Sequence, residues 1–415
     1  MFVAHESTAG GAPLTQIVIA ALISLTFLAP ALLVVLAERR DQRNPAGRLA
    51  DLLGTRLGAP RWLVLPSLTL FASLLSAGVG VYWDVPYHVD YGRDEGPLAN
   101  PAHYLILFGL LGVFASGLLS MGLARDPLPR RTFRVFRDWR APYGSVLVTA
   151  AGAFALLGFP LDDVWHRFFG QDVTLWGPTH VLMIGGAVIS TLGVAVLAAE
   201  ARQTGASGRG VAALEFKYAL WWLLGIGAFL MEFDIGVPQF PMVSQVVIIA
   251  VMGAWPLVWA RSAFGPGGAL LAAAAFLAAR GVLMLLASEL VDRSPHHFSL
   301  MLGQAVLIEL LALVVDHRRR YLFGALAGLA AGVGGTLAEW QWSQLFMPLP
   351  WPSAALPTYL GYAVIAGVGA GLIGAWQLSR LDEIAAHAPT GRTAARAASI
   401  RWRQHALLAL GAVLA

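Results

Sequence analysis

The sequence predicts an all-α protein, a polytopic bundle of about 11 or 12 transmembrane helices, and two observations support this class. Of the 415 residues, 57% are hydrophobic and only 13% are charged, whereas about a quarter of the residues of a soluble globular protein are charged. The apolar residues also form repeated runs of roughly twenty, the length of a helix that crosses a hydrocarbon core about 30 Å thick. The lipid bilayer is therefore the expected partner, and a soluble enzyme, a nucleic-acid binder and a coiled coil are excluded.

Apolar windows locate the helices one by one. We expect spans at 14–37, 60–83, 101–124, 142–162, 178–199, 213–233, 242–260, 267–288, 298–315, 321–339 and 355–377. A further apolar run begins at His405 and has only eleven residues, too few to cross a bilayer as a helix. We interpret 1–415 as a single transmembrane domain that contains hairpins at 60–124 and 142–199, further hairpins at 213–377, and a basic cytoplasmic segment with an incomplete last helix at 378–415.

The basic residues predict the orientation of the chain. Of the 28 Lys and Arg residues, 24 fall in loops on one side of these spans, and such loops are cytoplasmic by the positive-inside rule. The N-terminus is then outside, in a multi-pass protein of the inner (cytoplasmic) membrane. Six of the ten histidines and twelve of the 24 acidic residues fall at the opposite, outer helix ends or in the outer loops. Ionisable groups near hydrocarbon usually face a cavity, pair with one another or bind a ligand.

One outer motif occurs twice. The second copy reads LDDVWHRFFGQDVTLWGPTHVL and the first reads WDVPYHVDYGRDEGPLANPAHYL. Each contains Asp, His, Asp, Pro and His in that order, with the first His four residues and the second Asp ten residues after the first Asp. The last His follows the first Asp by 19 residues in the first copy and by 18 in the second. The chain therefore contains a duplicated helical hairpin.

The spacing of this motif is typical of a metal site. An Asp and a His four residues apart lie on the same face of a helix, and the turn brings back a second His from the next helix. Three such ligands leave coordination positions open, as catalytic or exchangeable sites require. Since the chain has no cysteine, thiolate zinc sites and iron–sulfur clusters are excluded. The predicted metal ligands are Asp84, His88 and His103 in the first copy and Asp162, His166 and His180 in the second.

Other residues of the motif support the ligands. The proline before each last histidine suits the first position of a helix. Asp94 and Asp172 are candidates to accept the second ring N–H of a ligand histidine. Pro86 falls between Asp84 and His88, where proline disrupts an ordinary helix, so the sequence favours the second site over the first. The alternative is a plain hydrogen bond between Asp and His at an interfacial helix end.

The motif resembles the metal-ligand segment in the C subunit of the copper-dependent membrane monooxygenases, the family of particulate methane and ammonia monooxygenases. The resemblance covers about twenty residues in each copy, and the last histidine comes one or two residues later than in the family pattern. It implies copper at Asp162, His166 and His180 and, by repetition, at Asp84, His88 and His103. It also implies an oxidoreductase of monooxygenase type that oxidises a small apolar substrate, and it leaves partner subunits or a homo-oligomer open.

Two other functions stay open at this point. In a b-haem electron-transfer protein the histidines would ligate haem iron, and in a metal or cation transporter the outer acidic residues would capture the ion. Zinc and iron are the alternatives to copper in the sites themselves.

Several features outside the motif also predict contacts. Arg280 and Glu309 lie at similar depths in neighbouring spans and are expected to form a buried ion pair. His296 and His297 lie close to Glu289 and Asp292 and form a weaker candidate metal site. Glycines at four-residue spacing predict close packing of helices; they are Gly324, Gly328, Gly332, Gly367 and Gly371.

Overall fold

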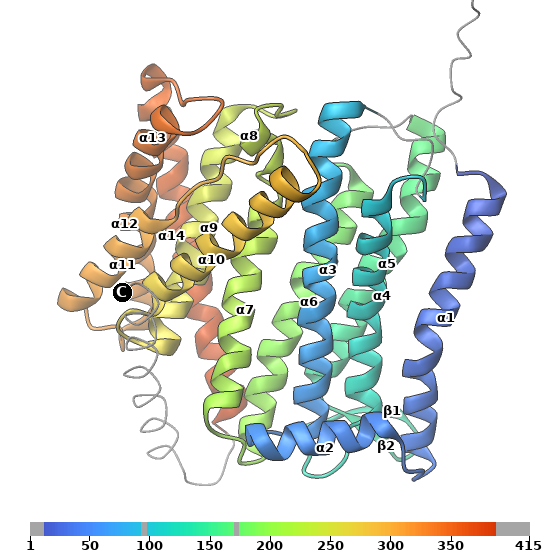
Figure 1. Ribbon diagram of the computed structural model, residues 1–415. Coiled ribbons are helices and arrows are strands. Elements are labelled where there is room, and N and C mark those ends of the chain that lie inside the picture. Colours follow the sequence, from blue (N-terminus) through green and yellow to red (C-terminus); the bar gives the residue numbers. More distant parts are fainter. Residues whose placement is uncertain (1–11, 93–97, 170–173, 387–415) are drawn as a thin grey trace, which may run out of the picture.

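The computed structural model describes residues 12–92, 98–169 and 174–386. Within this part the regular secondary structure consists of helices and one short β-hairpin (Figure 1). The helices of the first half are α1 (Leu14–Arg39), α2 (Pro45–Leu57), α3 (Arg61–Tyr91), α4 (Pro101–Gly122), α5 (Tyr143–Phe169) and α6 (Pro178–Gln203), with strands β1 (Phe133–Phe136) and β2 (Trp139–Ala141) before α5. Those that follow are α7 (Arg209–Ala228), α8 (Met231–Ile235), α9 (Met242–Phe264), α10 (Gly268–Leu285), α11 (Leu302–Val314), α12 (Arg320–Ala330), α13 (Thr336–Leu345) and α14 (Leu356–Ala385). Two π-helical turns, Leu286–Leu290 and Ala331–Gly335, follow α10 and join α12 to α13, and a 3-10 turn, Ser353–Ala355, precedes α14.

The prediction of a multi-pass membrane protein is confirmed. Among the described residues, ten helices or joined helices are long and apolar enough to cross a membrane. The predicted spans match these helices except in the second half. The span expected at 298–315 contains only the 13-residue helix α11, which is about 20 Å long at 1.5 Å per residue. The span expected at 213–233 ends at Ala228, and the short helix α8 follows it as a separate element. The apolar run from His405 lies outside the described residues.

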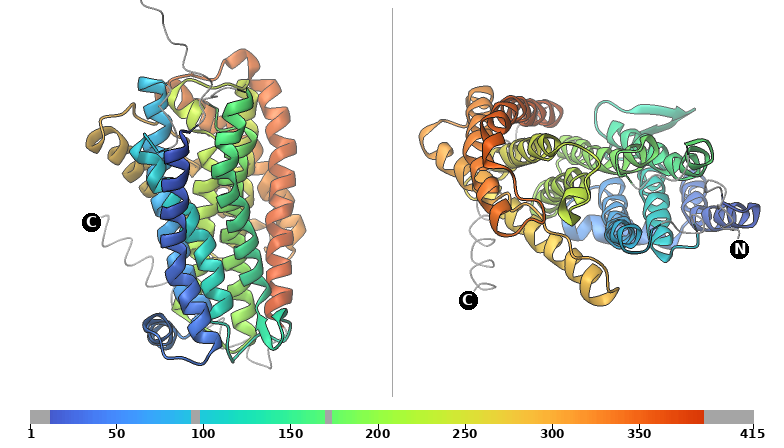
Figure 2. Two further views of the ribbon diagram at one scale, coloured as in Figure 1. Left: turned by 90° about the vertical axis from the view of Figure 1, so that its right-hand side faces the viewer. Right: turned by 90° about the horizontal axis from the view of Figure 1, so that it is seen from above.

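The helices form two packed groups that lie side by side (Figure 2). In the first group α3, α4, α5 and α6 pack against one another in sequence order, and α1 lies against α4. In the second group α14 packs against α9 and α12, while α10 and α11 lie on the outside of α9. Helix α7 contacts α6 on one side and α9 on the other. A separate buried apolar core fills each group, with Trp62 and Leu123 in the first and Trp259 and Phe323 in the second.

Two elements at one end of the bundle were expected only as loops. Helix α2 lies across that end, and the β-hairpin lies at the same end on the opposite side of the bundle (Figures 1 and 2). The Asn44 side chain accepts the N–H of Gly47 at 2.7 Å and so caps the start of α2. Gly58 ends the helix in a left-handed conformation, with φ of 64°. Five of the 24 basic residues that predicted the cytoplasmic side belong to these two elements.

Glutamate side chains cap the beginnings of three helices. Glu200 accepts the N–H groups of Tyr143 and Gly144 at 2.8 and 2.9 Å, at the start of α5. Glu309 does the same for Gly267 and Ala269 at the start of α10, and Glu339 for Leu300 and Met301 before α11. The first N–H groups of a helix have no partner within it, and leaving them unpaired inside a membrane protein costs several kcal/mol each. These carboxylates therefore have structural roles.

The expected ion pair between Arg280 and Glu309 is wrong. Arg280 pairs instead with Asp234 of α8, both side chains being almost fully buried. Glu309 pairs with Arg261 of α9 at 2.7 Å. Similar depth in two neighbouring spans did not identify the partner, because the break between α7 and α8 brings a carboxylate from a third element close to Arg280.

The predicted close packing of glycines is confirmed between α12 and α14. A Cβ atom added at Gly328 would collide with the carbonyl oxygen of Gly367, and one added at Gly324 would collide with that of Gly371. The backbones of the two helices are therefore in direct contact, which only residues without a side chain allow.

We expect the Gly328→Ala substitution to destabilise the protein, because the opposing atom is backbone and cannot move aside. Overpacking of this kind costs about 1–3 kcal/mol, measurable as a lower Tm of the detergent-solubilised protein. The matched control is Gly369→Ala on α14, where an added Cβ meets no atom within 4 Å. Equal melting temperatures for the two variants would contradict the packing argument.

Candidate metal centre

The first predicted triad is assembled between α3 and α4. Asp84 and His88 lie one turn apart on α3, and the Oδ1 of Asp84 is 3.4 Å from the Nε2 of His88. The same oxygen is 2.9 Å from the Nε2 of His103, in the first turn of α4. Pro101 is the first residue of α4, as the sequence predicts. The exposed fractions of the three side chains are only 15–18%.

Two groups orient this triad. Asn100, the N-cap residue of α4, accepts the N–H of Ala102 through Oδ1 at 3.0 Å. Its Nδ2 donates to Oδ1 of Asp84 at 2.6 Å. The Nδ1 of His88 is 2.9 Å from the carbonyl oxygen of Gly92. Since a carbonyl can only accept, the proton of that ring lies on Nδ1.

The expectation that Pro86 weakens the first site is not supported. Helix α3 runs through Pro86 to Tyr91, and Asp84 and His88 stay on one face. A proline removes one hydrogen bond from the helix, but α3 continues past it and packs against α4.

The second triad has the same form between α5 and α6. The Nε2 of His166 is 3.1 Å from Oδ2 of Asp162, and the Nε2 of His180 is 3.4 Å from Oδ1. The rings of His166 and His180 are 6.2 Å apart between centroids, compared with 6.0 Å for His88 and His103. The hydroxyl of Thr179 donates to Oδ1 of Asp162, and the Nδ1 of His180 lies 2.7 Å from the carbonyl oxygen of Thr174.

In each triad three donor atoms lie within 4.8 Å of one another. Ligands about 2.1 Å from a tetrahedral metal ion are about 3.4 Å apart, close to the Asp–His distances of 2.9–3.4 Å here. Among the described residues, only these two groups of His, Asp and Glu side chains converge in this way. The residues around His296 do not form such a group.

The positions of the protons on the His88 and His180 rings favour a cation at each triad. Because His88 and His180 donate through Nδ1 to carbonyl oxygens, the Nε2 of each neutral ring has a lone pair that faces a carboxylate oxygen. Two lone pairs facing each other repel. Either an additional proton on the ring or a cation between the atoms removes this repulsion, so each triad is suited to bind a metal ion.

The two triads lie at the same end of the bundle, opposite α2 and the β-hairpin (Figure 1). This agrees with the prediction that the duplicated hairpins present their histidines on one side. Asp94 and Asp172, predicted to support the ligands, lie outside the described residues.

The structure places around the triads several side chains that the motif does not identify. Asn100 and Thr179 bind the ligand carboxylates directly, and Glu232 of α8 acts one step further away. Glu232 accepts the hydroxyl of Thr174 and the N–H of Leu175, both at 2.7 Å, in the turn whose carbonyl orients His180. Asn100 could have been found as an N-cap before Pro101, whereas only the fold brings Glu232 to this turn.

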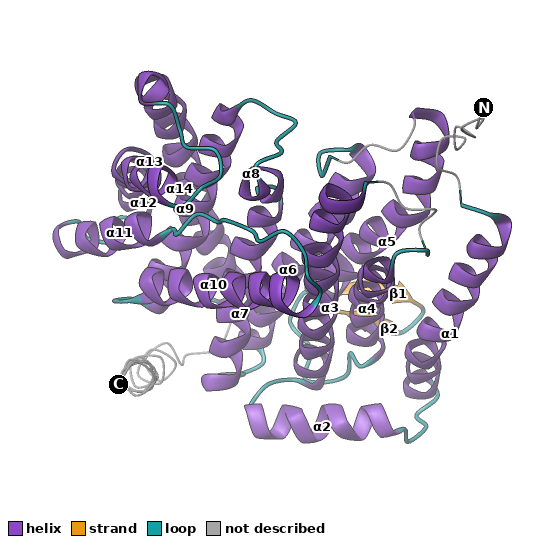
Figure 3. Ribbon diagram, turned by 45° about the horizontal axis from the view of Figure 1, so that its top comes forward, coloured by secondary structure: helices purple, strands orange, loops and turns teal. Residues whose placement is uncertain are grey.

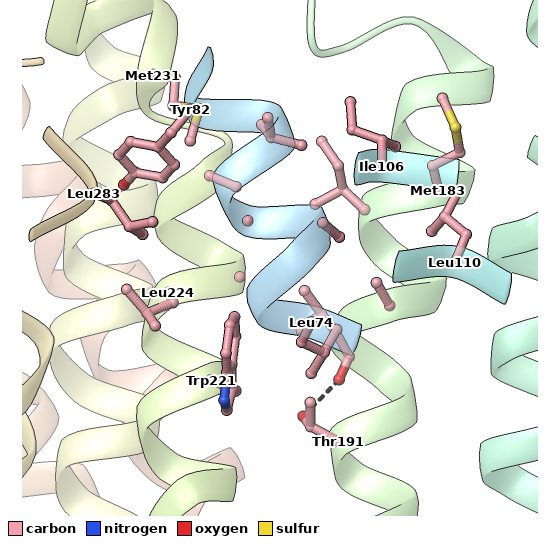
Figure 4. A pocket seen from close by; sticks show the side chains of 18 residues that line it. Leu74, Tyr82, Ile106, Leu110, Met183, Thr191, Trp221, Leu224, Met231 and Leu283 are labelled. Carbon is pink, nitrogen blue, oxygen red and sulfur yellow. Dashed lines mark hydrogen bonds between the residues drawn. The ribbon is translucent and has the colours of Figure 1, made fainter. Parts of the chain in front are cut away.

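An apolar cavity of about 100 Å³ is lined by residues of α3, α4, α6 and α7, together with one residue each of α8 and α10 (Figure 4). Ile106 and Leu110, three and seven residues after His103, line it from α4. Met183 and Ala187, three and seven residues after His180, line it from α6. The cavity therefore begins one helical turn away from the second histidine of each triad.

Comparisons of this chain with protein-family models, with curated proteins and with solved structures found no match.

We expect Thr179→Val to weaken metal binding at the second triad only, because it removes the hydrogen bond that orients Asp162. Loss of such a supporting contact typically lowers metal affinity about 10–100-fold. Competition with a chelator of known affinity measures this, and Thr191→Val on the same helix, whose hydroxyl donates only to the Val188 carbonyl oxygen, is the control. Unchanged affinity in Thr179→Val would show that the carboxylate does not need this contact.

Proposed function

We propose that this chain is an integral membrane metalloprotein that binds a transition metal at two Asp/His/His sites. The observation that carries the proposal is the duplicated triad, in which one aspartate and two Nε2 atoms converge in each copy. Asp84, His88 and His103 would hold one ion, and Asp162, His166 and His180 the other. Three protein ligands leave positions open for an exchangeable molecule.

Copper is the metal we propose, and oxidation–reduction is the chemistry it would supply when bound. The resemblance of the motif to the copper-dependent membrane monooxygenases supports both, and imidazole is a suitable ligand for copper, zinc and iron alike. The protein's own contribution is to hold the histidines in one tautomer and to keep the site largely shielded from water. A monooxygenase-like oxidoreductase is the reaction class we favour.

The apolar cavity supports a small apolar substrate. Its lining is almost entirely hydrocarbon, and Leu74, Ile106, Leu110 and Met183 face into it (Figure 4). An apolar cavity of this kind stays dry and binds apolar molecules. A molecule dissolved in the lipid could reach it without passing through water.

The distribution of charge supports an outer location for both sites. The triads lie at the end opposite α2 and the β-hairpin, whose arginines favour the cytoplasmic side. In an inner membrane this orientation directs the sites towards the periplasm.

The rival functions fit the geometry less well. Two histidines that ligate haem lie on opposite faces of a porphyrin, whereas here an aspartate occupies the space between each pair of rings. For a cation transporter, the carboxylates in the second half would have to be available to the ion, but Glu309 and Glu339 cap helices and Asp234 pairs with Arg280.

Metal analysis of the purified full-length protein and its histidine variants tests the proposal. We expect two ions per wild-type chain, one in His88→Ala, one in His166→Ala and none in the double variant, because each substitution removes one ligand of one site. A copper EPR signal identifies the metal, and a Soret band would indicate haem instead.

The matched control is His317→Ala, which changes a half-exposed histidine in the loop before α12 and should keep both ions. Circular dichroism should show equal helix content in all variants. Full metal content in the double variant would refute metal binding at the triads.

A further inference from the structure

Two elements at one end of the bundle belong neither to the spanning helices nor to the proposed metal sites. Helix α2 connects α1 to α3, and the β-hairpin connects α4 to α5. Both lie at the end opposite the triads, on opposite sides of the bundle (Figures 1 and 2). Helix α2 runs across the direction of the spanning helices (Figure 3). Because the spanning helices cross the membrane, an element that lies across their ends is parallel to the membrane surface.

Helix α2 has one face packed on the protein and one exposed face. On the packed face, a Cβ atom added at Gly47 would lie 2.7 Å from Nη2 of Arg61, so the glycine lets α2 rest directly on the start of α3. On the other face, the exposed fractions of Leu49 and Leu52 are 45% and 48%. Residues three apart lie on the same side of a helix. The two leucines therefore form an apolar strip along the exposed face.

Arginines accompany this strip. Arg48 and Arg56 are exposed and lie four residues before and after Leu52, on the same side of the helix. The carboxylate of α2, Asp51, pairs instead with Arg61 at 3.2 Å. Arginine can lay its apolar stem along hydrocarbon while its guanidinium reaches the polar headgroups. An apolar strip accompanied by arginines is therefore typical of a helix that lies in the membrane interface.

The β-hairpin shows the same combination on the other side of the bundle. The exposed fractions of Phe133 and Phe136 are 42% and 63%, and that of Tyr143, which follows the hairpin, is 50%. The ring centroids of Phe133 and Tyr143 are 6.4 Å apart. The guanidinium carbon of Arg137 lies 5.1 Å from the ring centroid of Phe136. Exposed aromatic rings beside arginines also indicate a segment at the membrane interface.

The hairpin is attached to the bundle through its third aromatic residue. The Nε1 of Trp139 donates to the carbonyl oxygen of Met121, at the end of α4, at 2.8 Å. The guanidinium carbon of Arg39, at the end of α1, lies 5.3 Å from the ring centroid of Trp139. Trp139 therefore faces the bundle, while Phe133 and Phe136 face outwards.

Positive charge dominates both elements. Over residues 40–56 and 126–140, nine exposed arginines form no ion pair within the described part of the chain. Exposed carboxylates without an ion pair number only two in the same ranges, Asp126 and Asp138. The nine are Arg40, Arg43, Arg48, Arg56, Arg130, Arg131, Arg134, Arg137 and Arg140. A partner that offers both negative charge and hydrocarbon complements this surface, and the leaflet beside the helix ends offers both.

We propose that α2 and the β-hairpin lie in the headgroup layer of the membrane and bind anionic phospholipids. The leucines of α2 and the phenylalanines of the hairpin enter the hydrocarbon boundary, and the arginines bind the lipid phosphates. Because the two elements lie on opposite sides of the bundle, they oppose its tilting in the membrane. The proposal is independent of metal binding, since it uses none of the residues of the two triads.

Spin labels test the insertion. The chain has no cysteine, so one label can be attached to the full-length protein in nanodiscs that contain phosphatidylglycerol. Oxygen concentrates in lipid and a nickel chelate stays in water. We expect the ratio of their collision rates to be about five-fold higher at Leu49→Cys and Phe136→Cys than at Thr55→Cys. Thr55 is an exposed residue of the same helix, about 120° around it from Leu49.

Equal collision ratios at the three positions would overturn the proposal. That result is expected if a soluble protein, which is absent from the nanodiscs, normally covers these side chains. Circular dichroism should show equal helix content in the three labelled proteins.

Lipid selectivity tests the role of charge. We expect the wild-type protein to retain spin-labelled phosphatidylglycerol about two-fold over phosphatidylcholine, and this preference to disappear in 1 M salt. It should decrease in Arg48→Gln/Arg56→Gln and in Arg134→Gln/Arg140→Gln. The control Arg318→Gln/Arg319→Gln removes two exposed arginines from the loop before α12 and should leave it unchanged. No preference in the wild-type protein, or an equal loss in the control, would contradict the proposal.

Discussion

The hydrocarbon core of a membrane offers no hydrogen-bond partner, so polar groups at helix ends have to be satisfied within the protein. This requirement explains the capping glutamates. Glu200, Glu309 and Glu339 each accept two N–H groups where a helix begins, and so allow helices to start next to other helices and not in water. The same requirement pairs Arg280 with Asp234. Acidic residues that resemble functional groups in the sequence therefore turn out to stabilise the fold.

The two Asp/His/His triads depend on the same principle at the end of the bundle. In each triad one carboxylate is shared by two imidazoles and by one further donor, Asn100 in the first and Thr179 in the second. The duplicated hairpins thus reach the same arrangement with different supporting side chains. The resulting sites are largely buried, oriented and adjacent to an apolar cavity, three properties that suit a metal acting on a molecule from the lipid.

The two halves of the molecule are connected at the second triad and at α3. Glu232 of α8 holds the turn that contains Thr174, and the carbonyl of Thr174 orients His180. On α3, Asp84 faces α4 while Tyr82 contacts His296 in the other half. The second half, which has no triad among the described residues, therefore supports the first half directly.

The sequence by itself determined the membrane class, ten of the spans and the members of both Asp/His/His triads, because these depend on local periodicity. The length of an apolar run indicates a spanning helix. An Asp–His spacing of four residues indicates one helix face, and a proline before the last histidine indicates the start of a helix. Only the tertiary structure decided the partner of Arg280, the break before α11 and the roles of Asn100, Thr179 and Glu232. These depend on contacts between residues far apart in the chain. The continuation of α3 through Pro86 belongs with them, since packing against neighbouring elements outweighed a local preference.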